Sequence, residues 1–339
     1  MTGTTGTVPA VAVTAPLRCV FVVGPTATGK TALAVDLARR FGGEIVSADS
    51  RQVYRRLDLG TGKDLAEYGA GANRVAHHLI DVAEPQEDYH LFRFVAEARA
   101  ALAAIAARGR LPIVVGGSGL YVNALLEGYG LDGAATDPAL RRELEGATDA
   151  DLLVLLRREA PDLAERVDSS QRRRLLRAVE IARSRNLPAT PSLTPLPLRA
   201  LLLGPYYARS VVHARIARRL DARLEAGLVE EVAALHADGL SWDRLAWFGL
   251  EYRCVGLYLQ GELSRAQMRE TLLARIRQFC RAQDVWFRKM EREGKDIYWL
   301  PGGELEPAAS LVQRFLEERE LPLPTLRLSA TLYGPQTSR

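Results

Sequence analysis

The sequence predicts an α/β fold, in which a parallel β-sheet is covered on both faces by helices and a helical domain is inserted into this core. Short apolar runs typical of buried strands recur along the chain, and helical stretches separate them. Residues 136–195 break this pattern, because they are rich in Leu, Arg and Glu and contain no credible strand. We therefore expect one core with an insertion, not two domains in tandem.

The elements of the core follow one another in the order that this fold requires. The first strand, residues 18–23, leads through a glycine-bearing turn into a helix over residues 31–41. A single long amphipathic helix is expected over residues 216–235, because apolar side chains recur there every three or four residues. The remaining expected strands are residues 44–49, 77–82, 111–117, 198–204 and 298–303. A helix is expected over residues 92–109, and more helices are expected between the end of the long helix and about residue 293.

These elements define four expected regions. Residues 1–17, rich in Thr, Ala and Pro, are expected to be a disordered leader. The core comprises residues 18–135 and 196–305, and the insertion comprises residues 136–195 and ends in a Pro-rich linker. A C-terminal helix and tail cover residues 306–339.

Composition narrows the protein class. The chain has 339 residues, 47% of them hydrophobic and 25% charged, which is enough to bury a large core. Its first residues lack a basic start and an apolar stretch long enough for export or membrane spanning. Cys19, Cys254 and Cys280 lie far apart, so neither a disulfide framework nor a zinc module is expected. These features predict a cytoplasmic protein with no membrane segment.

Charge is unevenly distributed along the chain. Residues 1–140 contain 13 Lys and Arg against 14 Asp and Glu, whereas residues 141–223 contain 17 against 10. Such a basic segment suits a polyanion such as nucleic acid, although solvated helix faces would give the same composition.

A phosphate-binding loop (P-loop) lies between the first strand and its helix. The segment GPTATGKT matches the P-loop pattern in the strand–loop–helix context that the motif needs. Backbone N–H groups and the helix N-terminus would hold phosphate oxygens, and Thr31 would hold Mg²⁺. Only four of the 45 basic residues are Lys, and one of them is Lys30. The motif predicts a diphosphate or triphosphate ligand bound by Gly24, Thr26, Ala27, Thr28, Gly29, Lys30 and Thr31.

Two polar residues follow other predicted strands. Asp49 ends the strand at 44–49 and would face the crevice where open α/β sheets bind ligands. It is a candidate general base or metal partner, or a helix N-cap. Ser118 follows the glycine turn after 111–117 and would bond a diphosphate oxygen, position an acceptor or cap a helix. P-loop kinases and NTPases commonly use a strand that ends in a metal-holding Asp, and both Asp49 and Asp81 end apolar runs, so phosphoryl transfer stays open.

Histidine and arginine clusters supply further candidates. His77, His78 and Asp81 have metal-binding side chains, but alternation along a strand would separate them, and we expect a structural strand. Arg215 and Arg219 lie one helical turn apart and would clamp a diphosphate from the side opposite the P-loop lysine, or remain solvated. A third cluster combines arginines with aromatic rings, which would suit phosphate contacts and stacking on unpaired bases. Buried aromatic rings with solvated arginines would give the same pattern. The members of this cluster are Arg172, Arg173, Arg174, Arg177, Arg281, Trp286, Phe287 and Arg288.

Taken together, the motifs resemble the tRNA dimethylallyltransferase family and occur in its order, roughly from Phe21 to Arg288. They are GPTATGKT, SADSRQVY, DLGTGK, HHLIDV, LPIVVGGSGLYVNALLEG, DPALRREL, RRLLRAVEIA, HARIARRLDARLEAG and RAQDVWFR. Such an ordered set is far more specific than a P-loop alone. The resemblance implies a P-loop NTPase-like core of the NMP-kinase type, with the insertion gripping the anticodon stem-loop of tRNA.

The resemblance also implies a reaction and a set of roles. A dimethylallyl group would pass from dimethylallyl diphosphate to N6 of the adenine at tRNA position 37, next to the anticodon, with Mg²⁺ and without consuming ATP. Asp49 would take the proton from N6, Ser118 would lie near the reacting groups, and the P-loop with Arg219 would bind the diphosphate. The implied enzyme is a monomer. Its tRNA contacts would be Asp49, Ser50, Arg51, Gln52, Ser118, Arg141, Arg173, Arg174, Arg177, Tyr252, Arg253, Arg281, Gln283, Trp286 and Arg288.

The chain departs from the family pattern at three places. Residues 60–64 read GTGKD where the family usually reads GTAKP. Glu251 precedes Tyr252 and Arg253 where the family usually has glycine, and Ser118 replaces threonine. The first two departures bear on acceptor contacts, whereas serine keeps the hydroxyl group.

Three other functions would share part of this pattern. A prenyltransferase acting on free AMP, ADP or ATP would share the P-loop and Asp49 but have no use for the basic insertion. A P-loop kinase for a nucleotide or small metabolite would need ATP and no prenyl donor. A non-catalytic RNA-binding protein would have no reason to keep Asp49, Lys30 and Thr31.

Overall fold

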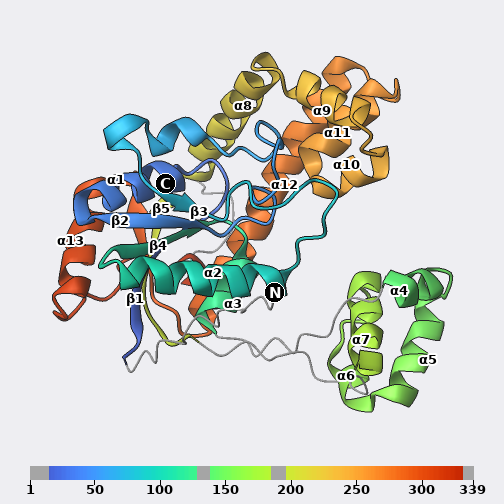
Figure 1. Cartoon of the computed structure of the whole chain (residues 1–339), viewed down its shortest axis with the longest axis horizontal. Coiled ribbons are helices and arrows are strands. Elements are labelled where there is room, and N and C mark those ends of the chain that lie inside the picture. The colour runs from blue at the N-terminus through green and yellow to red at the C-terminus, as the bar shows by residue number, and fades with distance from the viewer. Residues whose placement is uncertain (1–14, 128–137, 185–195, 331–339) are drawn as a thin grey trace, which may run out of the picture. The chain divides into compact units, whose positions relative to one another are not determined.

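The computed structural model describes residues 15–127, 138–184 and 196–330 (Figure 1). The chain divides into two compact units, one formed by residues 1–128 with 196–339 and the other by residues 129–195. Most of the expected leader, the Pro-rich linker and the end of the expected tail lie outside the described residues.

The larger unit is built on a parallel sheet, as the sequence predicts. Within the described residues the sheet has six strands in the order β3-β2-β4-β1-β5-β6, and every neighbouring pair is parallel. Connections between such strands must cross over the sheet, which places helices on its faces. The strands are β1 (Leu17–Val23), β2 (Gly43–Ser47), β3 (His77–His78), β4 (Leu111–Gly116), β5 (Leu198–Tyr206) and β6 (Ile297–Pro301).

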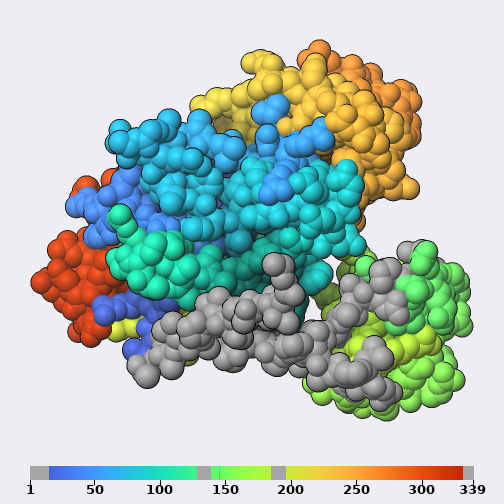
Figure 2. All heavy atoms as spheres, in the orientation of Figure 1, coloured from blue at the N-terminus to red at the C-terminus, as the bar shows by residue number. Residues whose placement is uncertain are grey.

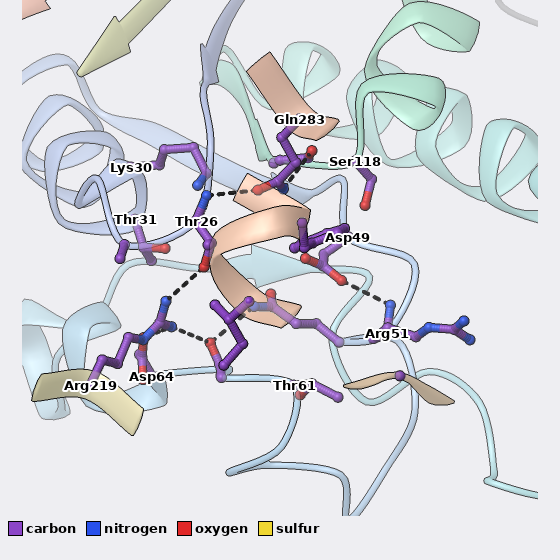
Figure 3. A pocket seen from close by; sticks show the side chains of 18 of the residues that line it. Thr26, Lys30, Thr31, Asp49, Arg51, Thr61, Asp64, Ser118, Arg219 and Gln283 are labelled. Carbon is purple, nitrogen blue, oxygen red and sulfur yellow. Dashed lines mark hydrogen bonds and ion pairs between the residues drawn. The ribbon is translucent and has the colours of Figure 1, made fainter. Parts of the chain in front are cut away.

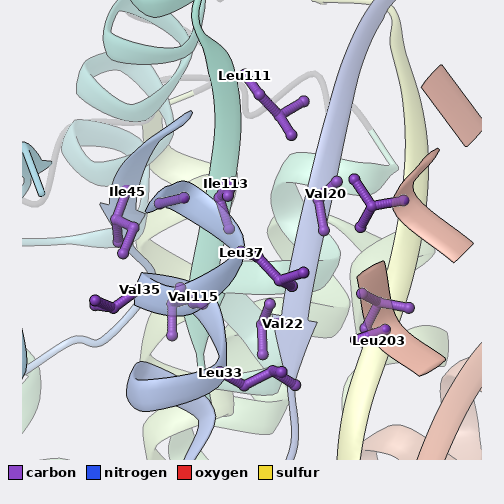
Figure 4. Close-up of a cluster of buried hydrophobic side chains, with 14 of the residues drawn as sticks. Val20, Val22, Leu33, Val35, Leu37, Ile45, Leu111, Ile113, Val115 and Leu203 are labelled. Carbon is purple, nitrogen blue, oxygen red and sulfur yellow. The ribbon is translucent and has the colours of Figure 1, made fainter. Parts of the chain in front are cut away.

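Helices α1 (Lys30–Phe41) and α13 (Leu305–Leu316) cover one face of the sheet. Val20 and Val22 of β1 pack there against Leu33 and Leu37 of α1 (Figure 4). Phe21, which alternation directs to the opposite face, is also fully buried. Both faces of the central strand are therefore covered, which explains why its sequence is a continuous apolar run.

The remaining helices of this unit complete the core and extend it. Helix α2 packs on β2 and β4, while α3 packs on α2 and α12. Their bounds are α2 (Leu91–Ala107), α3 (Gly119–Leu126), α8 (Arg209–Glu225), α9 (Leu228–Ala237), α10 (Trp242–Phe248), α11 (Leu250–Leu259) and α12 (Arg265–Arg292), with short 3₁₀ helices at η1 (Leu65–Tyr68), η2 (Gly71–Asn73) and η3 (Leu328–Ala330).

The single helix expected over residues 216–235 is wrong. The structure has two helices, α8 and α9, separated at Ala226 and Gly227. Gly227 has a φ of 104°, in the left-handed region that favours glycine and ends helices. Apolar spacing continues across the break, with Leu220 and Leu228 both buried, so periodicity alone could not reveal it.

The strand expected over residues 77–82 is also shorter than predicted, since only His77 and His78 pair with β2. Leu79 and Asp81 have φ values of 63° and 57°, which turn the chain out of the sheet. His78 Nε2 lies 2.8 Å from Glu44 Oε2. Within the described residues, no group of three or more His, Cys, Asp and Glu side chains could hold a metal ion.

The segment from residue 55 to 90 lies against the C-terminal helices. Figure 2 shows this blue-to-cyan segment beside the gold and orange surface of α8 to α11. Glu231 accepts hydrogen bonds from the backbone N–H groups of Asp58, Leu59 and Gly60 at 2.7–3.1 Å. Arg244 Nε donates to the Pro85 carbonyl at 2.8 Å. These bonds fix a long irregular segment on a helical support.

The smaller unit is a helical bundle with its own core. Leu152, Leu156, Leu175 and Val179 are buried in it, and no strand occurs among its described residues. Its helices are α4 (Pro138–Glu145), α5 (Asp149–Glu159), α6 (Pro161–Arg166) and α7 (Arg172–Ser184). In neither unit is a described helix both long and apolar enough to span a membrane.

Candidate active site

A cavity of about 890 Å³ opens where the strands end. Its walls come from the P-loop, from the segments that follow β2 and β4, and from α8, α11 and α12. Carboxyl ends of parallel strands are where open α/β sheets bind ligands. Figure 3 shows the P-loop residues Lys30 and Thr31 on one side of this cavity and Asp49 and Ser118 on the other.

The P-loop supplies a half-buried cation. Lys30 Nζ donates to the Pro25 carbonyl at 2.7 Å, and Thr28 Oγ1 donates to the same oxygen at 2.9 Å. Burial and, to a smaller extent, the nearby Arg219 together lower the pKa of Lys30 to about 8. Of the residues predicted to bind a diphosphate, Thr26, Ala27, Gly29, Lys30, Thr31, Arg215 and Arg219 line the cavity, whereas Gly24 and the buried Thr28 do not.

Gln283 of α12 joins two walls of the cavity. Its Oε1 accepts the Thr26 backbone N–H at 2.8 Å, and its Nε2 donates to the Gly117 carbonyl at 2.9 Å. The side chain is 7% exposed. Although we expected Gln283 to contact tRNA, both ends of its amide bind backbone, so the structure assigns it to holding the P-loop against the turn after β4.

Asp49 and Ser118 lie in neighbouring loops. One Asp49 oxygen accepts the Arg51 backbone N–H at 2.9 Å in a tight turn, and no described helix begins at this turn. Ser118 occupies the N-cap position of α3 without capping it; instead its Oγ lies 3.4 Å from the Ser50 N–H. Neither helix-capping interpretation fits this geometry, and both side chains line the cavity.

Hydrogen bonds from Lys63 and Gln52 hold the loop at residues 58–64 in place. Lys63 is buried, and its Nζ donates to the Tyr54 carbonyl at 2.7 Å and to Asp58 and Asp81. Gln52 Nε2 donates to the Gly62 carbonyl at 3.1 Å, which ties this loop to the one that contains Asp49.

Tyr252 differs from its predicted role. It is 1% exposed, its ring packs under Gly60, and its hydroxyl donates to Glu231 at 2.7 Å. We expected it to contact tRNA, but this packing makes it a support for the loop at residues 58–64. Its neighbour Arg253 is exposed on α11.

Four arginines of α8 line the cavity, and three of them, Arg215, Arg219 and Arg223, recur at intervals of one turn. Arg215 lies 3.8 Å from the centre of the Tyr207 ring. Arg219 donates to the Gly62 carbonyl at 3.2 Å, contacts Thr26 Oγ1 at 3.5 Å and pairs with Asp64. Arg223 was not predicted, although the four-residue spacing after Arg219 was visible in the sequence. The other cavity residues that sequence reasoning missed include Glu67, Arg218 and Phe279.

The segment after β2 also presents an aromatic contact. The Arg51 guanidinium lies 4.3 Å from the centre of the Trp247 ring, and Trp286 lines the cavity from α12. Phe279 is 47% exposed at the same cavity. The Phe279 and Trp286 rings add apolar surface to a cavity that the P-loop also lines.

The other residues predicted to contact tRNA lie elsewhere. Arg281 and Arg288 line a second cavity of about 90 Å³ together with His213. Burial lowers the pKa of His213, and Arg277, Arg209 and Arg281 lower it further, in that order. In the smaller unit, Arg173 is exposed and Arg174 pairs with Asp168, while Arg141 and Arg177 both pair with the buried Glu180.

Family models match most of the chain. The model described as IPP transferase matches residues 52–290, and the one described as isopentenyl transferase matches residues 17–81. A tRNA dimethylallyltransferase 2 of Trichlorobacter lovleyi is 47% identical over 282 residues, covering 83% of this chain and 91% of the relative. A tRNA dimethylallyltransferase 1 of Hahella chejuensis is 45% identical, covering 88% and 97%.

Solved structures agree with these matches. The tRNA isopentenylpyrophosphate transferase of Bacillus halodurans has a TM-score of 0.65 and 31% identity, covering 89% of this chain and 97% of its own. A eukaryotic dimethylallyltransferase acting on tRNA has a TM-score of 0.73, with 91% and 81% coverage, and at 23% identity it supports the fold alone.

The two hydrogen bonds by which Gln283 bridges Thr26 and Gly117 can be tested directly. Gln283→Ala should lower the free energy of unfolding by about 1–3 kcal/mol, because a backbone donor and a backbone acceptor both lose their partner. Hydrogen exchange at the Thr26 amide should accelerate as well. Gln278→Ala, an exposed glutamine on the same helix, is the control and should change neither quantity. Unchanged exchange at Thr26 in the Gln283 variant would show that the bridge does not hold the P-loop.

Proposed function

The chain belongs to the IPP transferase family, and we propose that it transfers the dimethylallyl group of dimethylallyl diphosphate to N6 of the adenine at tRNA position 37, next to the anticodon. The names of its relatives support tRNA as the acceptor and dimethylallyl as the group transferred. A monomeric cytoplasmic enzyme is the simplest form in which this reaction would occur.

One observation carries the proposal: a single cavity has cations on one wall and a carboxylate on the other. Lys30 and Arg219 lie at the P-loop, and Asp49 lies across from them (Figure 3). A prenyl transfer needs this separation, because negative charge grows on the leaving diphosphate while a proton leaves the acceptor.

The acceptor nitrogen is a poor nucleophile, since its lone pair is delocalised into the adenine ring. We assign Asp49 as the base that accepts a proton from N6 as the bond from N6 to the allylic carbon forms. Ser118, beside the Asp49 turn, would orient the acceptor.

The bond from the allylic carbon to the diphosphate oxygen breaks in the same reaction, and its electron pair leaves with the diphosphate. Lys30, Arg219 and the N-terminus of α1 would stabilise this developing charge, as preorganised donors do in a cavity that excludes water. No phosphate group is transferred, so ATP is not consumed.

Mg²⁺ fits the donor set of the cavity. Thr31, whose side chain carries a hydroxyl group, lines it. Mg²⁺ typically binds through few protein ligands together with phosphates and water. We propose that Thr31 and the donor diphosphate hold Mg²⁺, which would supply further neutralisation of the leaving group.

The acceptor base must leave the stack of the anticodon loop to enter the cavity, at a cost of a few kcal/mol. Exposed arginines of the smaller unit, such as Arg173 and Arg174, would offset this cost through contacts with the RNA backbone. Ser50, Arg51 and Gln52 line the cavity next to Asp49 and would surround the base.

The proposal predicts a product that mass analysis can identify. Purified protein with Mg²⁺, dimethylallyl diphosphate and unmodified tRNA should add one dimethylallyl group to an adenosine of the tRNA. Free AMP should remain unmodified, because it lacks the stem-loop contacts. Transfer to AMP alone would identify a prenyltransferase for free nucleotides, and ATP-dependent phosphate transfer without prenyl transfer would identify a kinase.

Asp49→Asn should lower the single-turnover rate of transfer by about 10²- to 10⁴-fold, the usual contribution of a general base. Binding of tRNA, measured by filter retention, should persist because the amide keeps the size of the side chain. Asp36→Asn on α1, which does not line the cavity, is the matched control. A fully active Asp49→Asn enzyme would remove this residue from its role.

Donor binding should weaken in alkaline solution. Below its pKa of about 8, Lys30 is protonated and attracts the diphosphate; above it the charge is lost. We expect kcat/KM for dimethylallyl diphosphate to fall as the pH rises through about 8. In Lys30→Arg, whose guanidinium stays protonated, this alkaline decrease should disappear up to about pH 9.5. The same decrease in both enzymes would assign it to another group.

A further inference from the structure

Two guanidinium groups lie side by side against Gly62. A Cβ atom built on Gly62 would lie 1.5 Å from Arg223 Nη2 and 2.6 Å from Arg219 Nη2. No side chain could occupy this position without displacing Arg223. The absence of a side chain at residue 62 therefore gives Arg223 its place in the cavity wall.

These neighbouring cations are held by separate carboxylates. Arg219 pairs with Asp64, whereas Arg223 Nη1 lies 4.0 Å from Glu251 Oε1, beyond hydrogen-bond distance. Arg223 and Glu251 expose only 14% and 18% of their side chains, so their charges are weakly screened. The pair is close enough to balance charge but too far apart to use the donors of the guanidinium.

Arg223 also has an unused donor. Its Nη2 is buried, and no acceptor among the described residues forms a hydrogen bond with it. Burial lowers the pKa of Arg223 to about 10, with Arg219 contributing next, so the group remains charged at neutral pH. A buried charged donor without an acceptor is costly, and at a cavity wall it is suited to a ligand oxygen.

We propose that Arg223 is a second arginine that binds the diphosphate of the prenyl donor. Glu251 is the counterion of Arg223 before the donor binds, and the diphosphate then replaces Glu251 as its partner. The inference rests on the proposed function for the identity of the donor. Phosphate oxygens of the donor or of tRNA would both suit Arg223. We assign the donor because Arg223 lies beside Arg219, which itself contacts Thr26 of the P-loop.

Two of the departures from the family pattern meet at this arginine. They are Gly62 and Glu251. One makes room for the Arg223 guanidinium and the other supplies its carboxylate. The two changes, distant in sequence, are thus one feature of this cavity.

Titration calorimetry of the full chain with inorganic pyrophosphate and Mg²⁺ tests the assignment without requiring catalysis. Arg223→Met should raise the Kd for pyrophosphate about tenfold or more, because it removes a charged donor. Glu251→Gln should lower the Kd, roughly threefold or more, because the competing carboxylate is gone. Arg265→Met, an exposed arginine at the start of α12, controls for net charge and should leave the Kd unchanged.

Gly62→Ala provides a coupled test. It should raise the Kd by displacing Arg223 and crowding Arg219, and its effect should be smaller in the Arg223→Met background, where only Arg219 remains to be crowded. Fully additive effects of the two substitutions would contradict the packing relation. Should Arg223→Met fail to fold, Arg223→Lys replaces it and should give a smaller rise in Kd.

The remaining outcomes are separable. A purely structural ion pair would lower the melting temperature in both the Arg223 and Glu251 variants and leave the Kd for pyrophosphate unchanged, which would overturn the proposal. A raised KM for tRNA with unchanged pyrophosphate binding would overturn it in favour of an RNA phosphate. Weakened pyrophosphate binding in Arg223→Met supports Arg223 as a diphosphate ligand even if no prenyl transfer is detected, and that result would count against the proposed function alone.

Discussion

The site depends on one constraint of the parallel sheet: all strands end at the same edge, so the cavity there must be closed by side chains from distant parts of the chain. Gln283 of α12 meets this constraint, since its amide binds the P-loop at Thr26 and the turn after β4 at Gly117. Glu231 does the same for the loop at residues 58–60. The chemistry assigned to the cavity requires both walls to stay at fixed separation.

The larger features could be predicted because they arise from local sequence. Continuous apolar runs identified the parallel strands, and the P-loop pattern placed Lys30 at the start of α1. The position of Asp49 followed from its place after a strand, and the cavity contains it. In each case, a few neighbouring residues determine the backbone, so the sequence pattern was sufficient.

Features that depend on tertiary contacts were missed or misassigned. The break between α8 and α9 at Gly227 lies within a continuous apolar spacing, so the glycine is its only signal in the sequence. Tyr252 and Gln283 have side chains that suit RNA, yet both are buried and bind other parts of the protein. The spacing of Arg223 from Arg219 is visible in the sequence, but the place of Arg223 in the cavity wall depends on Gly62 and Glu251, which are far apart in sequence.

The central claim is that one cavity holds the leaving diphosphate on one wall and the acceptor adenine on the other. A crystal structure with an anticodon stem-loop and a slowly reacting thiodiphosphate analogue of the donor tests it most directly. The account predicts diphosphate oxygens at Lys30 and Arg219, and adenine N6 within hydrogen-bond reach of the Asp49 carboxylate. An adenine that remains stacked outside the cavity, or a diphosphate bound away from the P-loop, would contradict it.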